Sequence, residues 1–374
     1  MTQSNLCRWG FLGTAAIARK NWKAVRLSGN GRVAAVASRS LDRAKAFVDQ
    51  CSHETPQVEP VAAIGSYNEL LENPNIDAVY IPLPTGLRKQ YVIAAAEAGK
   101  HVLSEKPFAV NVADAREMID ACKMANVQLM DGVMFDHGQR IERVRHKLLD
   151  RKTLGQLRRI QTHFSFPTDD SFSKSNIRAN HELEPHGCVG DLGWYCIRFT
   201  LWISGWQLPK RVSARTLRSI GSDNGNGGRV PSEFSAEMVF KDGLSASFYC
   251  SFLTANQQTA TVSGSDGYLT LGDFVLPFYD GQAHWSTHRH DLEIDNCRWN
   301  FRKRSSDAAS DEYASGESNS QEVNMVRQFA QRVTQEKLDT RYSEWILKTQ
   351  TIVDACRQSA VADGQWVEVE GRKS

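Results

Sequence analysis

The fold is decided by a stretch near the N-terminus that reads Arg8-Trp-Gly-Phe-Leu-Gly-Thr-Ala-Ala-Ile-Ala18 and continues, after a helical run, as Arg32-Val-Ala-Ala-Val-Ala-Ser-Arg-Ser40. An apolar strand enters a tight glycine turn, the turn opens a helix, and a second apolar strand follows. This order is typical of one half of a dinucleotide-binding βαβ unit. Small residues let the backbone approach a pyrophosphate, and the start of the helix offers it N–H groups. The residues expected to contact the pyrophosphate are Gly13, Thr14, Ala15, Ala16 and Ile17.

The glycine turn departs from the usual pattern at its middle small-residue position, which is Ala15. A methyl group at that position restricts the backbone more than glycine would. Taken alone, the turn is therefore also compatible with a βαβ unit that binds no nucleotide.

The end of the second strand indicates which nucleotide this unit would bind. An acidic side chain there would bind the ribose 2′-hydroxyl of NAD, but this strand ends in serine and arginine. Guanidinium and hydroxyl groups suit a 2′-phosphate instead. We therefore expect NADP(H) in preference to NAD(H), bound by Ser38, Arg39, Ser40 and Arg43. The alternative is that these arginines are simply solvated at a strand end.

The composition limits the possible classes of protein. The chain has 374 residues, is 41% hydrophobic and 24% charged, and carries a net charge of +2, which favours two soluble domains without a nucleic-acid or membrane partner. Its eight cysteines are scattered and form no C-x-x-C pair, so we expect neither a metal site nor a disulfide framework. Reduced thiols, together with a first strand that begins almost at once, favour a cytoplasmic protein without a signal peptide.

The order of predicted elements indicates an α/β protein with two domains. Strands and helices alternate up to about residue 135, which predicts a mostly parallel Rossmann sheet in a dinucleotide-binding domain spanning 1–136. Strands dominate afterwards, with hairpin turns expected at Asp242-Gly243 and Asp266-Gly267. We expect residues 137–374 to form a substrate-binding and oligomerisation α/β domain with an open, predominantly antiparallel sheet.

Two later segments lack a clear apolar period. Residues 305–320 are rich in Ser, Asp, Glu and Ala, which predicts a mobile surface loop. His284, His288 and His290 are close in sequence, but they have no cysteine or carboxylate partners at metal-ligand spacing. We therefore interpret them as part of a solvated loop.

Two predicted strands end in segments suited to contact a cofactor. One is followed by Pro82-Leu-Pro84-Thr85, and a turn at this edge of an α/β sheet is where ligands bind. The next strand ends in Glu105-Lys106-Pro107, where the lysine would lie beside a nicotinamide. A cis peptide bond before Pro107 would be one way to aim Lys106 inward. In isolation, the same three residues would more often be a surface Glu–Lys pair before a helix.

A third segment, Gly190-Asp-Leu-Gly-Trp-Tyr195, could supply acid–base chemistry. Asp191 and Tyr195 are four residues apart, which places a carboxylate and a phenol on one face of a helix. Oxidation of an alcohol needs a base for the hydroxyl proton, and a tyrosine can act as that base when a cation such as Lys106 favours its deprotonated form. The alternative is a buried helix start with an Asp cap and a packed tyrosine. Phe135, His137 and Arg140 follow the last Rossmann strand and could line the cleft.

Together, these motifs resemble the glucose–fructose oxidoreductase / inositol dehydrogenase (Gfo/Idh/MocA) family in order and spacing, over nearly the whole chain. The resemblance rests on Gly13-Thr-Ala-Ala-Ile-Ala18, Glu105-Lys106-Pro107 and Asp191-Leu-Gly-Trp-Tyr195. Within the family, Tyr80-Ile-Pro-Leu-Pro-Thr85 and Met130-Asp-Gly-Val-Met-Phe135 are similar to the dihydrodiol dehydrogenase / NADP-dependent D-xylose dehydrogenase branch.

The resemblance implies an oxidoreductase that transfers a hydride between NADP(H) and a hydroxyl or carbonyl of a sugar, polyol or trans-dihydrodiol. It implies Lys106, Asp191 and Tyr195 as catalytic residues, Tyr195 standing where many members have histidine. It also implies a homodimer through the C-terminal sheet. The residues expected to contact the cofactor near its nicotinamide are Pro82, Leu83, Pro84, Thr85, Glu105 and Lys106, and those expected to contact the substrate are Lys106, Phe135, His137, Asp191 and Tyr195.

Two departures from the family pattern affect the expected pocket. The glycines usual before the aspartate are partly replaced in Pro185-His-Gly-Cys-Val-Gly190, and a position that is often histidine is Arg88. Two other functions remain open. One is a non-catalytic nucleotide-sensing protein on the same fold, and the other is an oxidoreductase with a tightly held cofactor that acts on another small carbonyl or imine compound.

Overall fold

The computed structural model describes residues 6–149, 151–221 and 228–369. The chain forms two compact units, each assembled from separate segments. The first comprises Met1–His137, Asn180–Pro185 and Ser315–Gln350, and the second comprises Gly138–Ala179, His186–Ala314 and Thr351–Ser374. The sequence-based division into 1–136 and 137–374 grouped the two later segments of the first unit with the second domain. The roles assigned to the two domains stay predictions.

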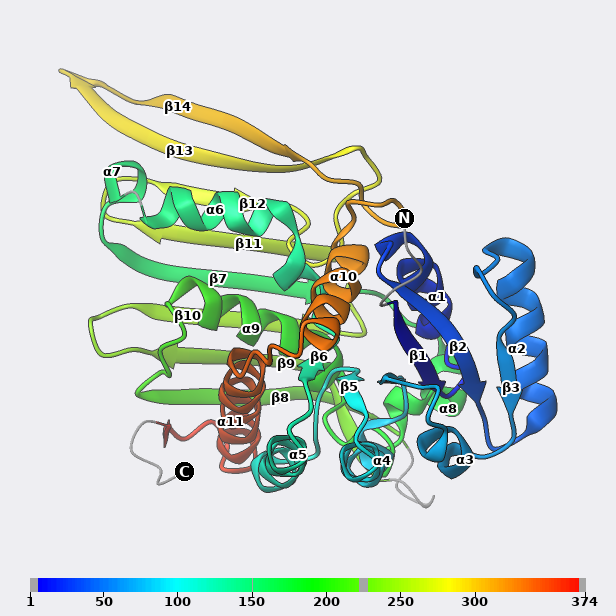
Figure 1. Cartoon of the computed structure of the whole chain (residues 1–374). Coiled ribbons are helices and arrows are strands. Elements are labelled where there is room, and N and C mark those ends of the chain that lie inside the picture. The colour runs from blue at the N-terminus through cyan, green and yellow to red at the C-terminus, as the bar shows by residue number, and fades with distance from the viewer. Residues whose placement is uncertain (1–5, 150, 222–227, 370–374) are drawn as a thin grey trace. The chain divides into compact units, whose positions relative to one another are not determined.

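The first unit is built on a six-stranded sheet in which every neighbouring pair of strands is parallel (Figure 1). The strand order is β3-β2-β1-β4-β5-β6, so the order reverses beside β1. In such sheets, nucleotides bind outside the carboxyl ends of the strands at this reversal. The strands are β1 Cys7–Leu12, β2 Gly31–Ala37, β3 Ala62–Ile64, β4 Ala78–Ile81, β5 His101–Ser104 and β6 Leu129–Asp131.

Helices alternate with these strands, and their ends follow the sequence. Ser66 Oγ accepts a hydrogen bond from the N–H of Glu69, and Asn111 Oδ1 accepts one from the N–H of Asp114, so both residues are the N-caps of the helices that follow them. The helices of the first unit are α1 Ala16–Ser28, α2 Leu41–Glu54, α3 Tyr67–Glu72, α4 Thr85–Glu97, α5 Val112–Met124, the 3₁₀ turn η1 Met134–His137 and α10 Gln321–Thr334. Helix α11, Arg341–Val361, begins in the first unit and ends in the second.

The core explains why α10 belongs to the first unit despite its distance in sequence. Its Phe329 ring lies 4.9 Å from that of Trp9 on β1, and both side chains are buried. Arg327 of the same helix donates a hydrogen bond to the carbonyl of Ser28 at the end of α1. Burial of two large aromatic side chains is a major stabilising contribution in a domain core, so α10 is held to the sheet by apolar packing and by this polar contact.

The second unit contains a nine-stranded sheet in the order β14-β13-β12-β11-β7-β10-β9-β8-β15. Its paired strands are antiparallel except β7 and β10. Figure 1 shows α6 and α9 against one face of this sheet. The strands are β7 Leu157–Ser165, β8 Arg211–Gly221, β9 Arg229–Val239, β10 Ser245–Ser251, β11 Gln257–Gly264, β12 Tyr268–Leu271, β13 Gln282–Asp295, β14 Arg298–Asp311 and β15 Val367–Glu368.

The predicted fold class is confirmed in both of its parts. The two predicted hairpin turns are present, since the N–H of Phe240 donates to the carbonyl of Leu244, and that of Gly264 donates to the carbonyl of Gly267. The remaining helical elements are α6 Gln139–Leu149, α7 Arg151–Leu154, α8 Asp170–Ser175, η2 Ile177–Ala179, the π-helical turn η3 Val189–Gly193 and α9 Trp194–Ile203.

The predicted loop over 305–320 is wrong in its first half, because β14 extends to Asp311 and pairs with β13 along its whole length. The pairing is between polar residues: Ser286 donates to Asp307, and His288 shares a hydrogen bond with Ser305. A strand whose side chains are polar on both faces shows no apolar alternation, which is why the sequence did not reveal it. The predicted loop around His284, His288 and His290 is also wrong, because all three residues lie in strand β13.

Along the part of the chain that the structure describes, no helix is both long and apolar enough to cross a bilayer.

The second unit contains a buried ion pair whose loss provides a test of its core. Arg140 on α6 pairs with Asp273, and the two residues are 4% and 5% exposed. Arg140→Met would leave the Asp273 carboxylate buried without its cation, so we expect the free energy of unfolding to fall by about 3–5 kcal/mol. Arg143 on the same helix bonds only the carbonyl of Ala309 at an exposed site, so Arg143→Met should cost under about 1 kcal/mol. Urea unfolding of both variants measures the difference, and equal losses would contradict the assignment.

Candidate active site

The glycine turn after β1 lets the backbone at Gly13 pack closely against a neighbouring segment. Gly13 has φ +124°, which favours glycine, and its N–H donates to the carbonyl of Ala37 at the end of β2. A Cβ at this position would lie 3.2 Å from Leu83 and 3.7 Å from Pro82. The turn and the segment after β4, which the sequence assigned to one cofactor site, therefore lie against each other.

The start of α1 is suited to an anion. Its N-cap is Ala15, which supplies no side-chain acceptor to the first N–H groups, and its first turn contains no acidic residue. Thr14 and Ala15 are partly exposed, and Ala16 and Ile17 are exposed. Uncapped N–H groups and the partial positive charge at a helix N-terminus stabilise a bound phosphate, so the turn fits the pyrophosphate of a dinucleotide.

The residues after β2 form a basic edge. Ser38 is buried, and its N–H donates to the carbonyl of Ile64, whereas Arg39 and Arg43 are exposed. Neither guanidinium makes an ion pair or hydrogen bond with another residue in the described part of the chain. Burial raises the pKa of Tyr67, and the charges of Arg39 and Arg43 oppose that rise. Both arginines therefore add positive charge to the exposed surface after β2.

Glu105 is anchored by a chain of hydrogen bonds inside the first unit. Tyr80 donates its hydroxyl proton to Glu105 Oε1 at 2.6 Å, and Asn21 donates to the Tyr80 oxygen at 2.8 Å. Burial, with the Glu105 charge adding to it, raises the pKa of Tyr80 well above its usual value, so Tyr80 remains a donor. Gly132 leaves room for the carboxylate, because a Cβ there would lie 3.0 Å from Glu105 Oε1.

Lys106 follows directly, and its backbone is fixed on both sides. Its N–H donates to Glu105 Oε2 at 3.2 Å, and its peptide bond to Pro107 is cis, as considered from the sequence. Arg88 donates to the carbonyl of Pro107 and also to that of Leu83, the latter from Nε at 3.0 Å and Nη2 at 2.6 Å. The guanidinium of Arg88 thus ties the lysine segment to the turn after β4, and burial lowers its pKa.

Thr85 completes this arrangement at the start of α4. Its N–H donates to Glu184 Oε1 at 3.1 Å and its hydroxyl to Glu184 Oε2 at 2.5 Å. Glu184 belongs to the short segment Asn180–Pro185 of the same unit. A carboxylate at a helix N-terminus is favourable, so this contact holds the segment against α4.

Asp191 and Tyr195 lie in the second unit, at the junction of η3 and α9. The predicted helix is present, but its first turn is π-helical, a feature frequent at functional sites. Asp191 is buried and pairs with Arg178, whose Nε lies 2.8 Å from Asp191 Oδ2. Tyr195 is partly exposed and packs edge-on against Phe164 with ring centroids 5.7 Å apart. The carboxylate is therefore oriented by a cation that the sequence analysis did not identify.

The residues that follow β6 have protein partners. His137 Nδ1 lies 2.9 Å from Gln328 Oε1, and its ring stacks on Tyr342 with centroids 6.0 Å apart. Phe135 is 2% exposed. Arg140 lies in the second unit, buried against Asp273, rather than lining a cleft. Substrate contact by Phe135 and His137 stays a prediction.

Among the described residues, no group of three or more His, Cys, Asp or Glu side chains is arranged to hold a metal ion. The imidazoles singled out from the sequence bond within the sheet instead. His288 Nε2 lies 3.0 Å from the Thr270 hydroxyl, and His290 Nε2 lies 3.1 Å from that of Tyr268.

Several residues that organise the site were missed in the sequence. Tyr80 carried a readable signal, because it is a polar residue at the end of a buried strand just before the Pro82–Thr85 turn. Arg178 and Glu184 lie in an irregular segment and are brought to their partners only by the tertiary fold. No local pattern marks such partners.

The sheet order, the glycine turn and the uncapped helix start define a dinucleotide-binding protein of the Rossmann class, joined to a second α/β unit. The chain belongs to the Gfo/Idh/MocA oxidoreductase family. The family model described as "Oxidoreductase family, NAD-binding Rossmann fold" matches residues 7–133, and that of the "GFO/IDH/MocA C-terminal domain" matches residues 143–270. The predicted family, fold and class of reaction are therefore confirmed.

Several characterised proteins are similar to this chain. Trans-1,2-dihydrobenzene-1,2-diol dehydrogenase of Sus scrofa is 32% identical over 269 residues, which cover 71% of this chain and 74% of that protein. D-xylose 1-dehydrogenase (NADP(+)) 2 of Haloferax volcanii is 34% identical over 263 residues, which cover 70% of this chain and 74% of that protein. The structure of a 3-ketoreductase from Actinomadura kijaniata in complex with NADP and TDP-benzene aligns with a TM-score of 0.75 at 25% identity. The alignment covers 95% of this chain and 98% of that chain.

Arg88 offers a test of how the lysine segment is held. Arg88→Met would remove the Arg88 donors from the buried carbonyls of Leu83 and Pro107. An unsatisfied carbonyl costs about 1–3 kcal/mol, so we expect the free energy of unfolding to fall by about 2–6 kcal/mol. The neighbouring Lys89 forms solvent-screened ion pairs with Asp114 and Glu117, so Lys89→Met should leave the free energy of unfolding almost unchanged. Urea titration measures both, and a loss for Arg88→Met as small as that of the control would refute the anchoring role.

Proposed function

We propose that this protein is an NADP-dependent dehydrogenase that transfers a hydride between NADP(H) and a hydroxyl or carbonyl of a sugar, polyol or trans-dihydrodiol. The observation that carries the proposal is the anchored Glu105-Lys106-Pro107 segment at the carboxyl edge of the parallel sheet. The relatives supply the substrate class, since they include a dihydrodiol dehydrogenase and a D-xylose dehydrogenase that uses NADP.

In this proposal, each cofactor segment has its own task. Residues 13–17 hold the pyrophosphate, Ser38, Arg39, Ser40 and Arg43 hold the 2′-phosphate, and Pro82–Thr85 with Glu105 flank the nicotinamide ribose. When bound, the cofactor accepts or donates the hydride. The protein supplies binding, orientation and proton transfer.

The proton step belongs to Lys106, Asp191 and Tyr195. The Tyr195 phenol takes the hydroxyl proton when the substrate alcohol is oxidised and returns it when a carbonyl is reduced. The Lys106 ammonium favours the phenolate and stabilises negative charge on the substrate oxygen. Asp191, paired with Arg178, accepts a hydrogen bond from a substrate hydroxyl and orients it.

Substitution of the two proposed proton-handling groups tests this step. Lys106→Ala and Tyr195→Phe should each lower kcat by about 10²–10⁴-fold, because positioned acid–base groups contribute that much. NADPH binding, followed by nicotinamide fluorescence, should survive in both. Lys89→Ala, the same change at a lysine whose partners are Asp114 and Glu117, serves as the control and should retain full activity.

An NADP⁺ activity panel across pentoses, hexoses, inositols and trans-diols identifies the substrate for these measurements. Full turnover in both variants would contradict the catalytic assignment. NADPH binding without turnover of any compound by the wild-type protein would favour the nucleotide-sensing alternative instead.

We further propose that NADP(H) is preferred over NAD(H). The support is the pair of exposed arginines after β2 that lack a carboxylate partner among the described residues. Two exposed guanidinium groups that follow the same strand suit a dianionic phosphate.

The cofactor preference is tested by removal of one arginine. Arg39→Ala should weaken NADPH binding by about 10–100-fold, as expected for loss of a hydrogen bond to a charged group, and NADH binding by less than about threefold. Lys45→Ala removes a charge from the exposed surface of helix α2, which begins two residues after Arg39, and should affect the binding of both nucleotides alike. Equal losses of NADPH and NADH affinity in Arg39→Ala would remove Arg39 from the phosphate site.

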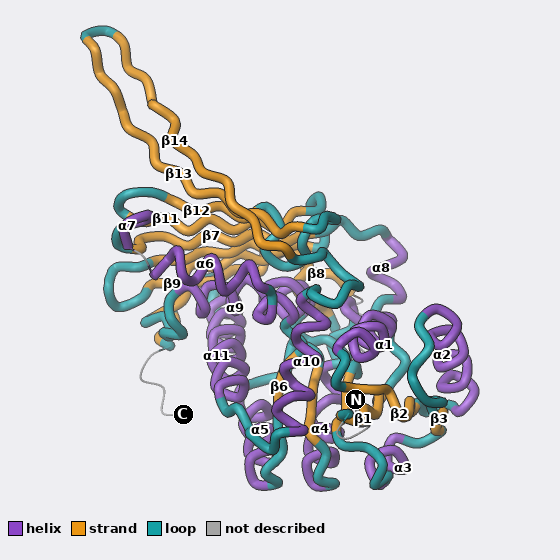
Figure 2. Tube along the Cα trace, turned by 45° about the horizontal axis from the view of Figure 1, so that its top comes forward, coloured by secondary structure: helices purple, strands orange, loops and turns teal. Residues whose placement is uncertain are grey.

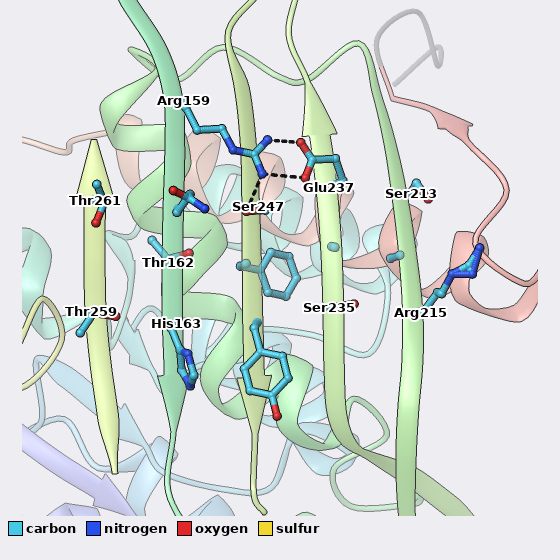
Figure 3. A pocket seen from close by; sticks show the side chains of 15 residues that line it. Arg159, Thr162, His163, Ser213, Arg215, Ser235, Glu237, Ser247, Thr259 and Thr261 are labelled. Carbon is cyan, nitrogen blue, oxygen red and sulfur yellow. Dashed lines mark hydrogen bonds and ion pairs between the residues drawn. The ribbon is translucent and has the colours of Figure 1, made fainter. Parts of the chain in front are cut away.

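We also propose a cytoplasmic homodimer formed through the second unit. All eight cysteines are free thiols, which suits a reducing compartment. The face of the nine-stranded sheet that carries Arg159, His163, Glu237, Ser247 and Thr261, here called the open face, is hollowed over a volume of about 600 Å³ (Figure 3). Arg159 pairs there with Glu237 and also donates to Ser247. None of the proposed catalytic residues lines this hollow, so it suits a protein partner better than the substrate.

A further inference from the structure

The outer parts of β13 and β14 form an arm, residues 289–304, that extends beyond the rest of the nine-stranded sheet (Figure 2). Strand β12 pairs with β13 only at Ser286, Thr287 and His288. Beyond His288, the arm therefore consists of two strands that pair only with each other. The turn at its tip is made by Asn296, with φ +49°, and Cys297.

The two faces of the arm differ in chemistry. Cross-strand pairing aligns Leu292 with Phe301 and Ile294 with Trp299, and strand alternation places all four on one face. Their exposed fractions are 47%, 71%, 56% and 65% in that order. The opposite face is polar, and three of its four arginines form the ion pairs Arg304–Asp291, Arg302–Glu293 and Arg298–Asp295.

This arrangement is unfavourable for an isolated molecule in water. A two-stranded hairpin without a covered apolar face is marginally stable at best. Two aromatic and two aliphatic side chains exposed next to one another form the kind of patch that marks an interaction surface. All three carboxylates of the polar face are already paired within the arm, so the apolar face is the one that needs a partner.

The register of the sheet shows which side of the molecule the apolar face belongs to. Thr261 pairs with Thr270, and Thr270 pairs with Ser286. Directly paired residues point to the same side of a sheet, and alternate residues of one strand do so as well. The even-numbered residues of β13, which include Leu292 and Ile294, therefore share the side of Thr261, so the apolar face of the arm continues the open face outward.

We propose that the apolar face of the arm packs on a second copy of this chain, extending an interface formed by the open faces. The inference rests on the proposed dimer and adds a contact that a sheet face alone does not supply. A two-fold interface uses the same patch twice, so the arm of each copy contributes. An aromatic side chain buries about 150–250 Å². Two arms with two such rings each therefore supply a substantial share of the roughly 1,200–2,000 Å² that a stable interface buries.

The buried area also shows that the two arms cannot form the interface between copies by themselves. The rings of two arms total roughly 600–1,000 Å² at most, which is below what a specific interface requires. The rest has to come from surface adjoining the apolar face of the arm. That surface is the open face, whose hollow is lined by polar and paired charged side chains.

The experiment compares full-length variants by sedimentation equilibrium over a dilution series. In Trp299→Ser/Phe301→Ser we expect the dimer dissociation constant to rise at least about 30-fold, since central aromatic anchors carry much of an interface's affinity. Glu293→Gln/Arg302→Gln changes the opposite face of the same arm and should alter the constant by less than about threefold. Circular dichroism confirms that both variants are folded.

A second measurement uses the tip of the arm. Cys297 is exposed and the other seven cysteines are buried, so a fluorophore can be attached there selectively. Energy transfer between donor-labelled and acceptor-labelled copies should appear on mixing and disappear in Trp299→Ser/Phe301→Ser.

Two results of these measurements would contradict the proposal. A wild-type dimer that the double variant leaves equally tight would overturn the role of the arm while leaving the open-face dimer intact. A wild-type protein that is monomeric at every concentration would overturn the second copy as the partner. Neither result depends on catalytic activity, so both are distinguishable from failure of the proposed reaction.

Discussion

The constraint on which the first unit depends is the burial of the Glu105 carboxylate. A buried carboxylate is costly unless donors surround it, and here Tyr80 and the N–H of Lys106 supply them. Burial keeps Tyr80 protonated, and Arg88 fixes the carbonyl that follows. The consequence is that Lys106 has a fixed backbone at the carboxyl edge of the sheet, where the Gly13 turn and the Leu83 segment also meet.

In the second unit, the alternation of side chains along the strands determines which residues are buried in the core and which form the exposed face of the sheet. Residues such as Ile160, Phe248 and Cys250 are buried toward the helices, while the alternate residues carry the polar open face. The same alternation continues into the arm, where the apolar residues lie on the side of the open face and are exposed. One geometric rule therefore produces a core, a polar hollow and an apolar patch from successive parts of one sheet.

Much of this could be predicted from the sequence. The glycine turn, the caps at Ser66 and Asn111 and the hairpin turns depend on neighbouring residues, and local patterns report them faithfully. The motif around Lys106 gave the family. The strand residues 305–311 could not be predicted, because they are held by cross-strand pairing of mostly polar residues rather than by burial of an apolar face. Arg178 and Glu184 escaped notice because contacts between distant segments leave no periodic trace.

The central claim is that Lys106 and Tyr195 act on the same substrate oxygen. The most direct measurement is a crystal structure with NADPH and a bound polyol. We expect Lys106 Nζ and Tyr195 Oη both to lie within hydrogen-bonding reach, about 2.6–3.2 Å, of one substrate oxygen beside the nicotinamide. If either group lies far from that oxygen or faces away from the nicotinamide ring, the proposed chemistry is contradicted.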